Sequence, residues 1–210
     1  MITIDYIYSA HSAYAYLGAP ELMRIAKAHG ARIRHVPIAL SPVVEAAGGL
    51  SFAGRTQAHV DYFFGRELER WAEYRGLPIL SHRPTHHDAP YDLANGVIVA
   101  AQEAGMDVDA VSLAILQAHW RDDADLSDAG VLAVLLGGDA GRLLEAAEGE
   151  AVQAVLAQNT QAAIADSVFG SPTYVVGGDA FYGQDHLPLV ERALGQPFRS
   201  AGFVNPPVDG

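Results

Sequence analysis

The chain has 210 residues, of which 50% are hydrophobic and 18% charged, and its formal net charge at pH 7 is −12. This length and composition provide one ordinary hydrophobic core. The strong negative charge argues against nucleic acid and anionic membranes as partners. The sequence contains no cysteine, which excludes a disulfide framework, a thiolate metal site, a cysteine nucleophile and a CxxC redox pair. Any thiol chemistry therefore needs a thiol from outside the protein.

The sequence also lacks the usual membrane and export signals. No run of 18 apolar residues occurs that could span a bilayer. The first residues, MITIDYIYSAHSAY, show neither a basic start nor a cleavage-site pattern. We therefore expect a cytoplasmic protein with no membrane partner.

The first forty residues are typical of a strand, a helix and a second strand. Residues 2–8 are β-branched and aromatic, which favours a buried strand. Residues 13–29 are rich in alanine and leucine and are followed by Gly30, a common residue at the end of a helix. Residues 31–40 are predicted as the second strand. The right-handed crossover rule makes these two strands parallel neighbours.

The rest of the chain is predicted as a helical block followed by a short hairpin and a helix. Residues 57–161 are predicted as a series of helices. Residues 173–176 and 180–182 are predicted as two short strands, because a Gly-Gly-Asp turn separates them. A final helix is expected at 187–194, and irregular coil after Gln196.

This order of elements defines the predicted fold class. A βαβ half followed by a ββα half is the thioredoxin arrangement, and both halves must share one sheet. We therefore predict an α/β protein that forms a single unit over residues 1–210. In it a thioredoxin-like domain, residues 1–50 plus 160–200, carries a large all-helical insertion at about 55–160.

Ser12 stands at the junction between the first strand and the first helix. It is suited to cap the helix, because a serine hydroxyl accepts a hydrogen bond from a free N–H of the first turn. A second role follows from the partial positive charge and free N–H groups at a helix N-terminus, which stabilise an anion. A hydroxyl at that point could donate to a thiolate and lower the pKa of the thiol. Ser9 and His11 are close enough in sequence to tune such a site.

Two features near the C-terminus each fit either a structural role or a ligand-binding role. Pro172 follows Ser171 directly before a strand, where proline is tolerated because no ladder N–H is needed. Alternatively, a cis bond there would turn the Ser171 N–H and C=O outward to pair with an extended peptide. Asp185 fits an N-cap of the last helix, or it could bind the α-amino group of a ligand whose carboxylate is taken by backbone N–H groups.

The loop at 77–90 contains the densest polar cluster of the sequence, namely His82, His86, His87 and Asp88. Histidine and aspartate are zinc ligands, but the helical HExxH spacing is missing. Two prolines in the loop suit a surface connection. We expect a mobile lid over a substrate pocket and no metal.

Several segments resemble one family of enzymes. Residues 12–17 (SAYAYL) resemble the Ser-Pro-(Tyr/Phe)-Ser-Tyr-Leu opening of the 2-hydroxychromene-2-carboxylate isomerases and of the related kappa-class glutathione transferases. Residues 168–173 and 181–187 are similar to the second signature of that family. Residues 69–72 and 118–120 also look like family positions. The resemblance covers nearly the whole chain and implies a DsbA-like thioredoxin fold with a helical insertion, in agreement with the order of elements.

The resemblance implies a glutathione cofactor and a set of site residues. It implies that Ser12 contacts the glutathione sulfur and that Ser171, before a cis Pro172, pairs with the tripeptide backbone. It also implies that the γ-glutamyl end is held by Tyr182, Gly183, Gln184 and Asp185. The family interconverts 2-hydroxychromene-2-carboxylate and trans-o-hydroxybenzylidenepyruvate in the bacterial breakdown of naphthalene-type aromatics.

The expected substrate is therefore a small aromatic or 2-oxo acid. We assign Arg55 to its carboxylate, because Lys27 is the sole lysine, and we add His86 and His87 to the substrate side. Two other functions stay open, a kappa-like glutathione transferase and a non-enzymatic thioredoxin-fold module that binds extended peptides. The resemblance is also compatible with a homodimer.

Overall fold

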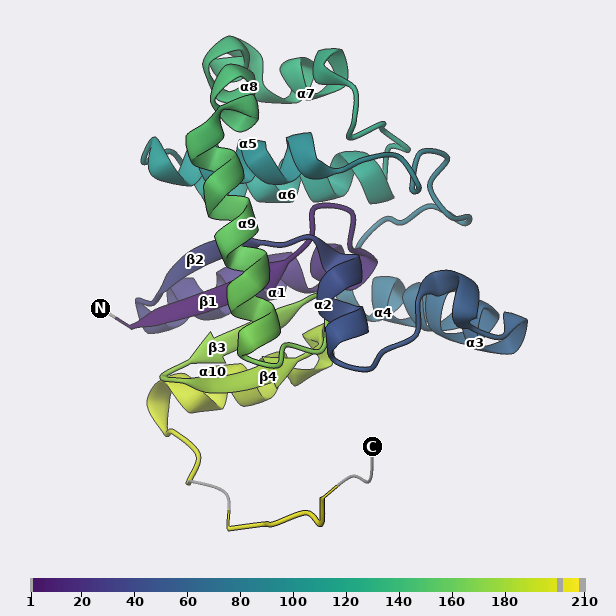
Figure 1. The fold of residues 1–210 in the computed structure, drawn as a ribbon, viewed down its shortest axis with the longest axis vertical. Coiled ribbons are helices and arrows are strands. Elements are labelled where there is room, and N and C mark those ends of the chain that lie inside the picture. The colour runs from purple at the N-terminus through teal and green to yellow at the C-terminus, as the bar shows by residue number, and fades with distance from the viewer. Residues whose placement is uncertain (1, 200–201, 208–210) are drawn as a thin grey trace.

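A four-stranded sheet in the order β2-β1-β3-β4 forms the centre of the computed structural model, which describes residues 2–199 and 202–207 (Figure 1). The strands are β1 (Thr3–Tyr8), β2 (Arg32–Pro37), β3 (Thr173–Val176) and β4 (Asp179–Tyr182). β1 pairs with β2 in parallel and with β3 antiparallel, and β4 is antiparallel to β3. The predicted thioredoxin sheet, built from both ends of the chain, is confirmed.

The first helix, α1 (Ala13–His29), has the predicted bounds. Ser12 is its N-cap, and Gly30 ends it in the left-handed conformation with φ 60°. The Gly30 N–H donates to the last carbonyls of the helix, a common way to end one. α1 connects the parallel strands β1 and β2, as the crossover rule requires.

The second strand is shorter than predicted, because the expectation of a strand over 31–40 is wrong at its C-terminal end. β2 stops at Pro37, and α2 (Leu40–Ala46) begins three residues later. The backbone between them is bonded to side chains from distant helices. Asn95 donates to the Ile38 carbonyl, and the Ala39 N–H donates to Thr160. These partners replace the ladder bonds that a longer strand would need.

Helices occupy the chain between β2 and β3, as predicted. A 3-10 turn (Phe52–Gly54) and α3 (Gln57–Asp61) lead through a π-helical turn (Tyr62–Arg66) into α4. The larger helices are α4 (Glu67–Arg75), α5 (Asp92–Glu103), α6 (Val108–Trp120), α7 (Ala129–Leu136), α8 (Ala140–Glu148) and α9 (Glu150–Ala165). After β4, a 3-10 turn (Gln184–His186) precedes α10 (Leu187–Gly195). Residues 197–199 and 202–207 form neither helix nor strand.

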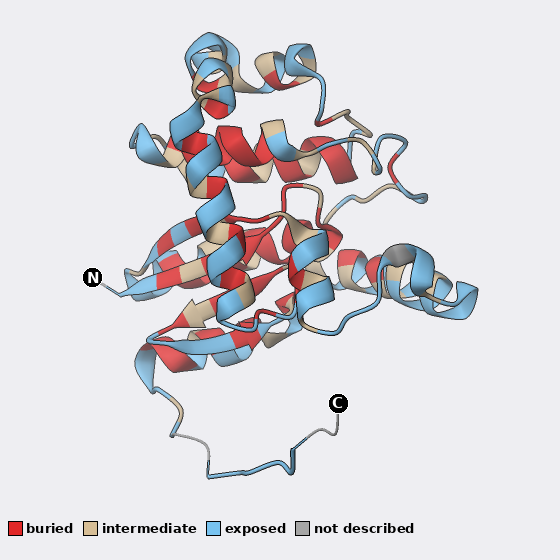
Figure 2. Cartoon of the chain, viewed as in Figure 1, coloured by how far each residue is buried: buried red, intermediate tan, exposed pale blue. Residues whose placement is uncertain are grey.

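The sheet is covered on both faces, and β1 shows how the sequence arranges this. Its alternate side chains Ile4, Tyr6 and Tyr8 belong to the core that includes α1 and α10. Ile7 points the other way and packs in a cluster with residues of α2 and α9. Figure 2 shows buried residues in β1 and also along α5 and α6 of the helical block. A strand with apolar residues on both faces needs such double cover.

The helical block is bonded to the free edge of β2. The side-chain amide of Gln102 on α5 accepts from the His35 N–H (2.8 Å) and donates to the His35 carbonyl (2.9 Å). It thus pairs backbone groups that an edge strand would otherwise leave open. The Tyr8 hydroxyl bridges the His35 ring and Ser112 of α6, at 2.8 and 2.6 Å. The sheet and the block are therefore joined through buried polar contacts.

α9 runs without a break across the predicted domain boundary near residue 160 and packs against α2 and β2. Figure 1 shows it extending from the helical block to the sheet. The division into 1–50 plus 160–200 and about 55–160 stays a prediction. Within the described residues, none of the helices combines the length and the apolar character needed to cross a membrane.

Candidate functional site

Ser12 lies where the first strand meets α1 and contacts two parts of the chain. Its Oγ accepts a hydrogen bond from the Ala15 N–H (3.3 Å), so the capping role is confirmed. The same hydroxyl donates to the Ser171 carbonyl at 3.4 Å. This long bond joins residues 159 positions apart. Ser12 is 8% exposed, so its hydroxyl is held between the helix end and the Ser171 loop.

The Ser171–Pro172 peptide bond is cis, as predicted. The Ser171 hydroxyl accepts from the Ser9 N–H at 3.1 Å, and the Pro172 carbonyl accepts from the Gly183 N–H at 2.9 Å. The Ser171 carbonyl, expected to face outward, already has Ser12 as one partner and keeps a second lone pair. In the described part of the chain, the Ser171 N–H makes no hydrogen bond.

A pocket of about 320 Å³ adjoins this loop, and we call it the Tyr182 pocket. Its lining comes from four segments of the chain: Tyr14, Tyr62, Phe63, Glu67, Trp71, Ser171, Tyr182, Gly183, Gln184, Asp185 and His186. Ser171 and the four residues expected at a γ-glutamyl end therefore share one pocket. Ser12 does not line it but is bonded to Ser171, which does.

Asp185 does not cap α10, so that interpretation is wrong. The helix has His186 at its N-cap position and no side-chain cap, and Asp185 lies in the preceding 3-10 turn. Its carboxylate lies so close to Gly183 that a Cβ there would collide with it, and Gly183 has φ +96°. The Asp185 side chain is 55% exposed, with His186 at 3.5 Å. The carboxylate is thus available to a ligand in the Tyr182 pocket.

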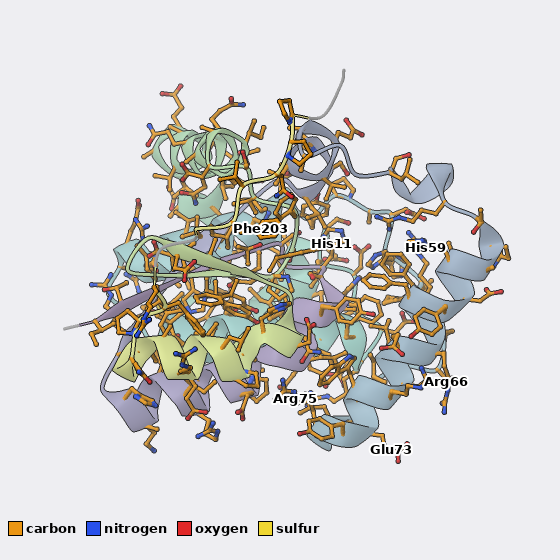
Figure 3. The ribbon with its side chains drawn as sticks, turned by 90° about the horizontal axis from the view of Figure 1, so that it is seen from below. His11, His59, Arg66, Glu73, Arg75 and Phe203 are labelled. Carbon is orange, nitrogen blue, oxygen red and sulfur yellow. The ribbon has the colours of Figure 1, made fainter. Side chains whose placement is uncertain are left out.

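Arg75, at the end of α4, supports this turn and was missed by sequence reasoning. Its guanidinium donates to the Gln184 side-chain oxygen (2.9 Å) and to the Gln184 carbonyl (3.2 Å). Figure 3 shows the Arg75 side chain between α4 and α10. Gln184 is only 1% exposed, and its Nε2 has no partner among the described residues. No sequence signal linked an arginine at a helix end to a glutamine 109 positions later.

Replacing Arg75 by methionine tests this support. The buried Gln184 oxygen would lose its donor, so we expect unfolding free energy to fall by about 1–3 kcal/mol and the turn at 184–186 to loosen. The matched control is Arg70→Met on the same helix, whose ion pair with Glu67 lies at the surface, so its loss should leave the unfolding free energy nearly unchanged. Urea denaturation of both variants measures the difference, and equal losses would contradict a supporting role for Arg75.

A second pocket, of about 310 Å³, contains His11, and we call it the His11 pocket. Its lining includes His11, Leu40, Ser41, Val44, Glu45, Leu50, Ser51, Arg55, Phe64, Arg83, His87, Asp88, Ala89 and Tyr91. Two of the three residues assigned to the substrate, Arg55 and His87, are thus brought together. His86 is elsewhere and lies 3.3 Å from Asp125.

The histidines of the loop at 77–90 face different partners. His82 lies 3.8 Å from Asp123, whereas His86 pairs with Asp125, so their side chains face different partners. Residues 2–199 and 202–207 contain no group of three or more histidine or carboxylate side chains that could hold a metal ion. The Thr85 N–H and hydroxyl both donate to Asp123, at 2.7 and 2.6 Å. The role of this loop as a lid stays a prediction.

Three histidines meet beside the His11 pocket, and sequence reasoning did not connect them. His11 stacks on Tyr91 with ring centroids 3.9 Å apart, and its Nδ1 lies 2.6 Å from the Ser9 hydroxyl. The His87 ring is 5.0 Å from the His11 ring, and His87 Nδ1 is 2.9 Å from His119 Nε2. Figure 3 labels His11 near the centre of the view.

Burial keeps these histidines neutral. It lowers the pKa of His87 to about 4, with a further contribution from His119. Burial, followed by the nearby His87 and His119, holds the pKa of His11 well below its usual range. The pKa of His119 is lowered for the same reason, chiefly burial. A neutral imidazole at neutral pH can accept a proton or a hydrogen bond.

Most of the chain is similar to proteins of known structure and name. The sequence model of one family, described as the DSBA-like thioredoxin domain, matches residues 3–195. Proteins named 2-hydroxychromene-2-carboxylate isomerase from Pseudomonas sp. (strain C18) and Pseudomonas putida are each 26% identical. The first match covers 93% of this chain and 91% of the relative, and the second 92% and 94%. A solved structure of a 2-hydroxychromene-2-carboxylate isomerase has a TM-score of 0.77 and 26% identity, covering 92% of this chain and 95% of that one.

Proposed function

This chain belongs to the DSBA-like thioredoxin domain family, and from that premise we propose that it is a glutathione-dependent isomerase. The proposed substrate is a small aromatic 2-oxo acid or its cyclic form, of the 2-hydroxychromene-2-carboxylate type. The names of its relatives support the reaction class. The observation that carries the proposal is the contact between Ser12 and Ser171, which places a hydroxyl at a helix N-terminus beside a pocket suited to a peptide ligand.

The residues of the Tyr182 pocket fit the γ-glutamyl end of glutathione. The exposed Asp185 carboxylate can take the α-amino group, and the free Ser171 N–H can pair with the peptide backbone. Gln184 is buried, and its side-chain oxygen is held by Arg75, so we assign it to supporting the turn that carries Asp185.

Because the chain has no cysteine, the thiol would come with the ligand. Bound glutathione would supply a thiolate that adds reversibly to a conjugated C=C bond and makes it briefly a single bond, about which rotation is fast. Ser12 would donate its hydroxyl hydrogen to the sulfur. Lowering a thiol pKa by about two units requires about 2.7 kcal/mol of preferential stabilisation of the thiolate. One charge-assisted hydrogen bond and a helix N-terminus together provide energies of that order.

The His11 pocket is suited to the substrate. Arg55 lines it and can meet a carboxylate, whereas Arg83, which also lines it, is paired with Asp88 of the same pocket. Its volume of about 310 Å³ fits a small bicyclic ligand. His11 lines this pocket and directly precedes Ser12 in the chain, which supports a substrate site close to the proposed sulfur position.

Glutathione binding is the first test. At a concentration of about 100 times Kd, a ligand specific for the folded state adds about 2.7 kcal/mol, which corresponds to a rise in Tm of about 5–11 °C for a chain of this size. S-methylglutathione keeps the γ-glutamyl end and serves as a positive control, and cysteinylglycine, which lacks that end, as a negative one. No rise in Tm with millimolar glutathione would overturn the proposal. Isomerisation of 2-hydroxychromene-2-carboxylate, followed by absorbance, then tests the reaction.

The alternatives have different outcomes in the same assays. A kappa-like transferase would consume glutathione and form a thioether product, whereas an isomerase regenerates it. A non-enzymatic peptide-binding module would bind extended peptides equally well after Ser12 is replaced. A homodimer and a cytoplasmic location remain parts of the proposal that sedimentation and cell fractionation would address.

A further inference from the structure

The hydrogen bonds around His119 determine which ring nitrogens carry hydrogen. His119 Nδ1 lies 3.2 Å from the Ala124 carbonyl, which can only accept, so Nδ1 carries the hydrogen. In the neutral ring Nε2 then has a lone pair, and it lies 2.9 Å from His87 Nδ1. His87 must therefore donate through Nδ1. In the neutral His87 ring, Nε2 is left as the basic nitrogen.

This basic nitrogen is accessible. His87 lines the His11 pocket. Among the described residues, His87 Nε2 has no hydrogen-bond partner, and it is not one of the fully buried unpartnered atoms. The His87 ring also packs edge-on against Trp120, with ring centroids 5.3 Å apart, and this contact leaves Nε2 without a hydrogen-bond partner among the described residues. A fixed tautomer with an open lone pair can accept a proton, and the low pKa of His87 keeps this lone pair unprotonated at neutral pH.

We propose that His87 Nε2 is the proton acceptor for the hydroxyl group of a cyclic hemiketal carboxylate bound in the His11 pocket, and that His119 positions it by holding its tautomer. This inference rests on the proposed isomerase function and names a residue for it. The substrate class is the one already proposed, and Arg55 in the same pocket can meet its carboxylate.

Ring opening of the hemiketal takes up no proton and releases none overall. The hydroxyl O–H bond of the hemiketal breaks, and its proton goes to His87 Nε2. The bond between the hemiketal carbon and the ring oxygen then breaks, its electron pair stays on the ring oxygen, and a C=O bond forms. His87 returns the proton to that oxygen, so the net change is an isomerisation with no oxidant or reductant.

Replacement of His87 by asparagine should lower kcat by about 10²- to 10⁴-fold, the usual effect of losing a general base. The rise in Tm with glutathione should be unchanged, because His87 does not line the Tyr182 pocket. His82→Asn, on the same loop but outside the His11 pocket, is the matched control and should keep wild-type kcat. Wild-type kcat in His87→Asn, with glutathione binding intact, would overturn the inference alone. If the unmodified protein does not bind glutathione, the proposed function itself is overturned.

Two variants of His119 separate positioning from packing. His119→Phe removes the acceptor of His87 Nδ1, whereas His119→Gln restores an acceptor oxygen. We expect kcat to fall in the first variant and to recover in the second. The charged and titratable groups that act on His87 are His119, Arg83 and Asp88, and the His11 ring lies 5.0 Å away, tilted by 46°. Because His119 helps to keep the pKa of His87 low, the acid limb of kcat/KM should move to higher pH in His119→Gln. Equal kcat in both variants would contradict the positioning role.

The tautomer of His87 can also be measured directly, without substrate. Nitrogen-15 NMR of the folded, unmodified protein at pH 7 reports which ring nitrogen of each histidine carries hydrogen. We expect His87 protonated at Nδ1 and unprotonated at Nε2. A His87 ring protonated at Nε2 would overturn the inference whatever the activity.

Discussion

Replacement of Ser12 by alanine is expected to lower kcat by about 10²- to 10³-fold, the usual loss when one preorganised donor to a developing anion is removed. The variant should still fold and still bind glutathione, because the Tyr182 pocket does not include Ser12. The pKa of the bound thiol should rise toward the free value of about 8.5. Thiolate absorbance in the ultraviolet measures it without interference, because the protein has no cysteine of its own.

The capping role of Ser12 requires its own control. Loss of an N-cap costs about 0.5–2 kcal/mol of stability whatever the chemistry at the site. Asp107 caps α6 through a bond to the Ala110 N–H, far in sequence from the site. Asp107→Ala should therefore lose similar stability and keep the thiol pKa. A Ser12→Ala protein whose bound glutathione titrates like wild type would show that Ser12 is only a cap.

Replacement of Asp185 by asparagine is expected to weaken glutathione binding by about 10- to 100-fold. A hydrogen bond to a charged group contributes about 1.5–3 kcal/mol, and each 1.4 kcal/mol is about a factor of ten in Kd. The fold should be unaffected, because Asp185 makes no capping bond to α10. Since the γ-glutamyl end is remote from the reacting sulfur, kcat at saturating glutathione should change little.

Isothermal titration of glutathione measures this effect. Asp179→Asn provides the matched control, because Asp179 is an exposed aspartate at the β3–β4 turn and its replacement makes the same change in net charge. Equal Kd values for the two variants would show that Asp185 does not hold the α-amino group.

Local signals in the sequence were sufficient for the elements that position Ser12. A β-branched stretch, an alanine-rich helix and a terminal glycine gave α1 with its observed bounds, since each signal acts on neighbouring residues. The Gly-Gly-Asp turn gave the β3–β4 hairpin in the same way. Placing both halves in one sheet followed from topology, and this brought Ser12 to Ser171.

Other features depend on contacts between distant residues, which one sequence does not reveal. Residues 31–40 have the composition of a strand throughout. The strand ends at Pro37, however, because Asn95 and Thr160 form hydrogen bonds with the backbone groups that follow. Asp185 is a residue type that commonly caps helices. In the structure it lies instead in a 3-10 turn that Arg75 bonds, and there it lines the Tyr182 pocket.

The arrangement of the histidines also depends partly on local sequence and partly on the fold. Their number and spacing in the loop at 77–90 are visible in the sequence, and from spacing alone they form one cluster. The fold separates them, because His82 and His86 pair with different aspartates while His87 turns toward His119 of α6. The sequence by itself determined the thioredoxin arrangement, the absence of a cysteine thiol and the residues around Ser12 and Ser171. Only the tertiary structure decided that Arg75 supports the Tyr182 pocket and that His87 and His119 lie together beside the His11 pocket. Hydrogen bonds between residues more than thirty positions apart depend on how the helices pack.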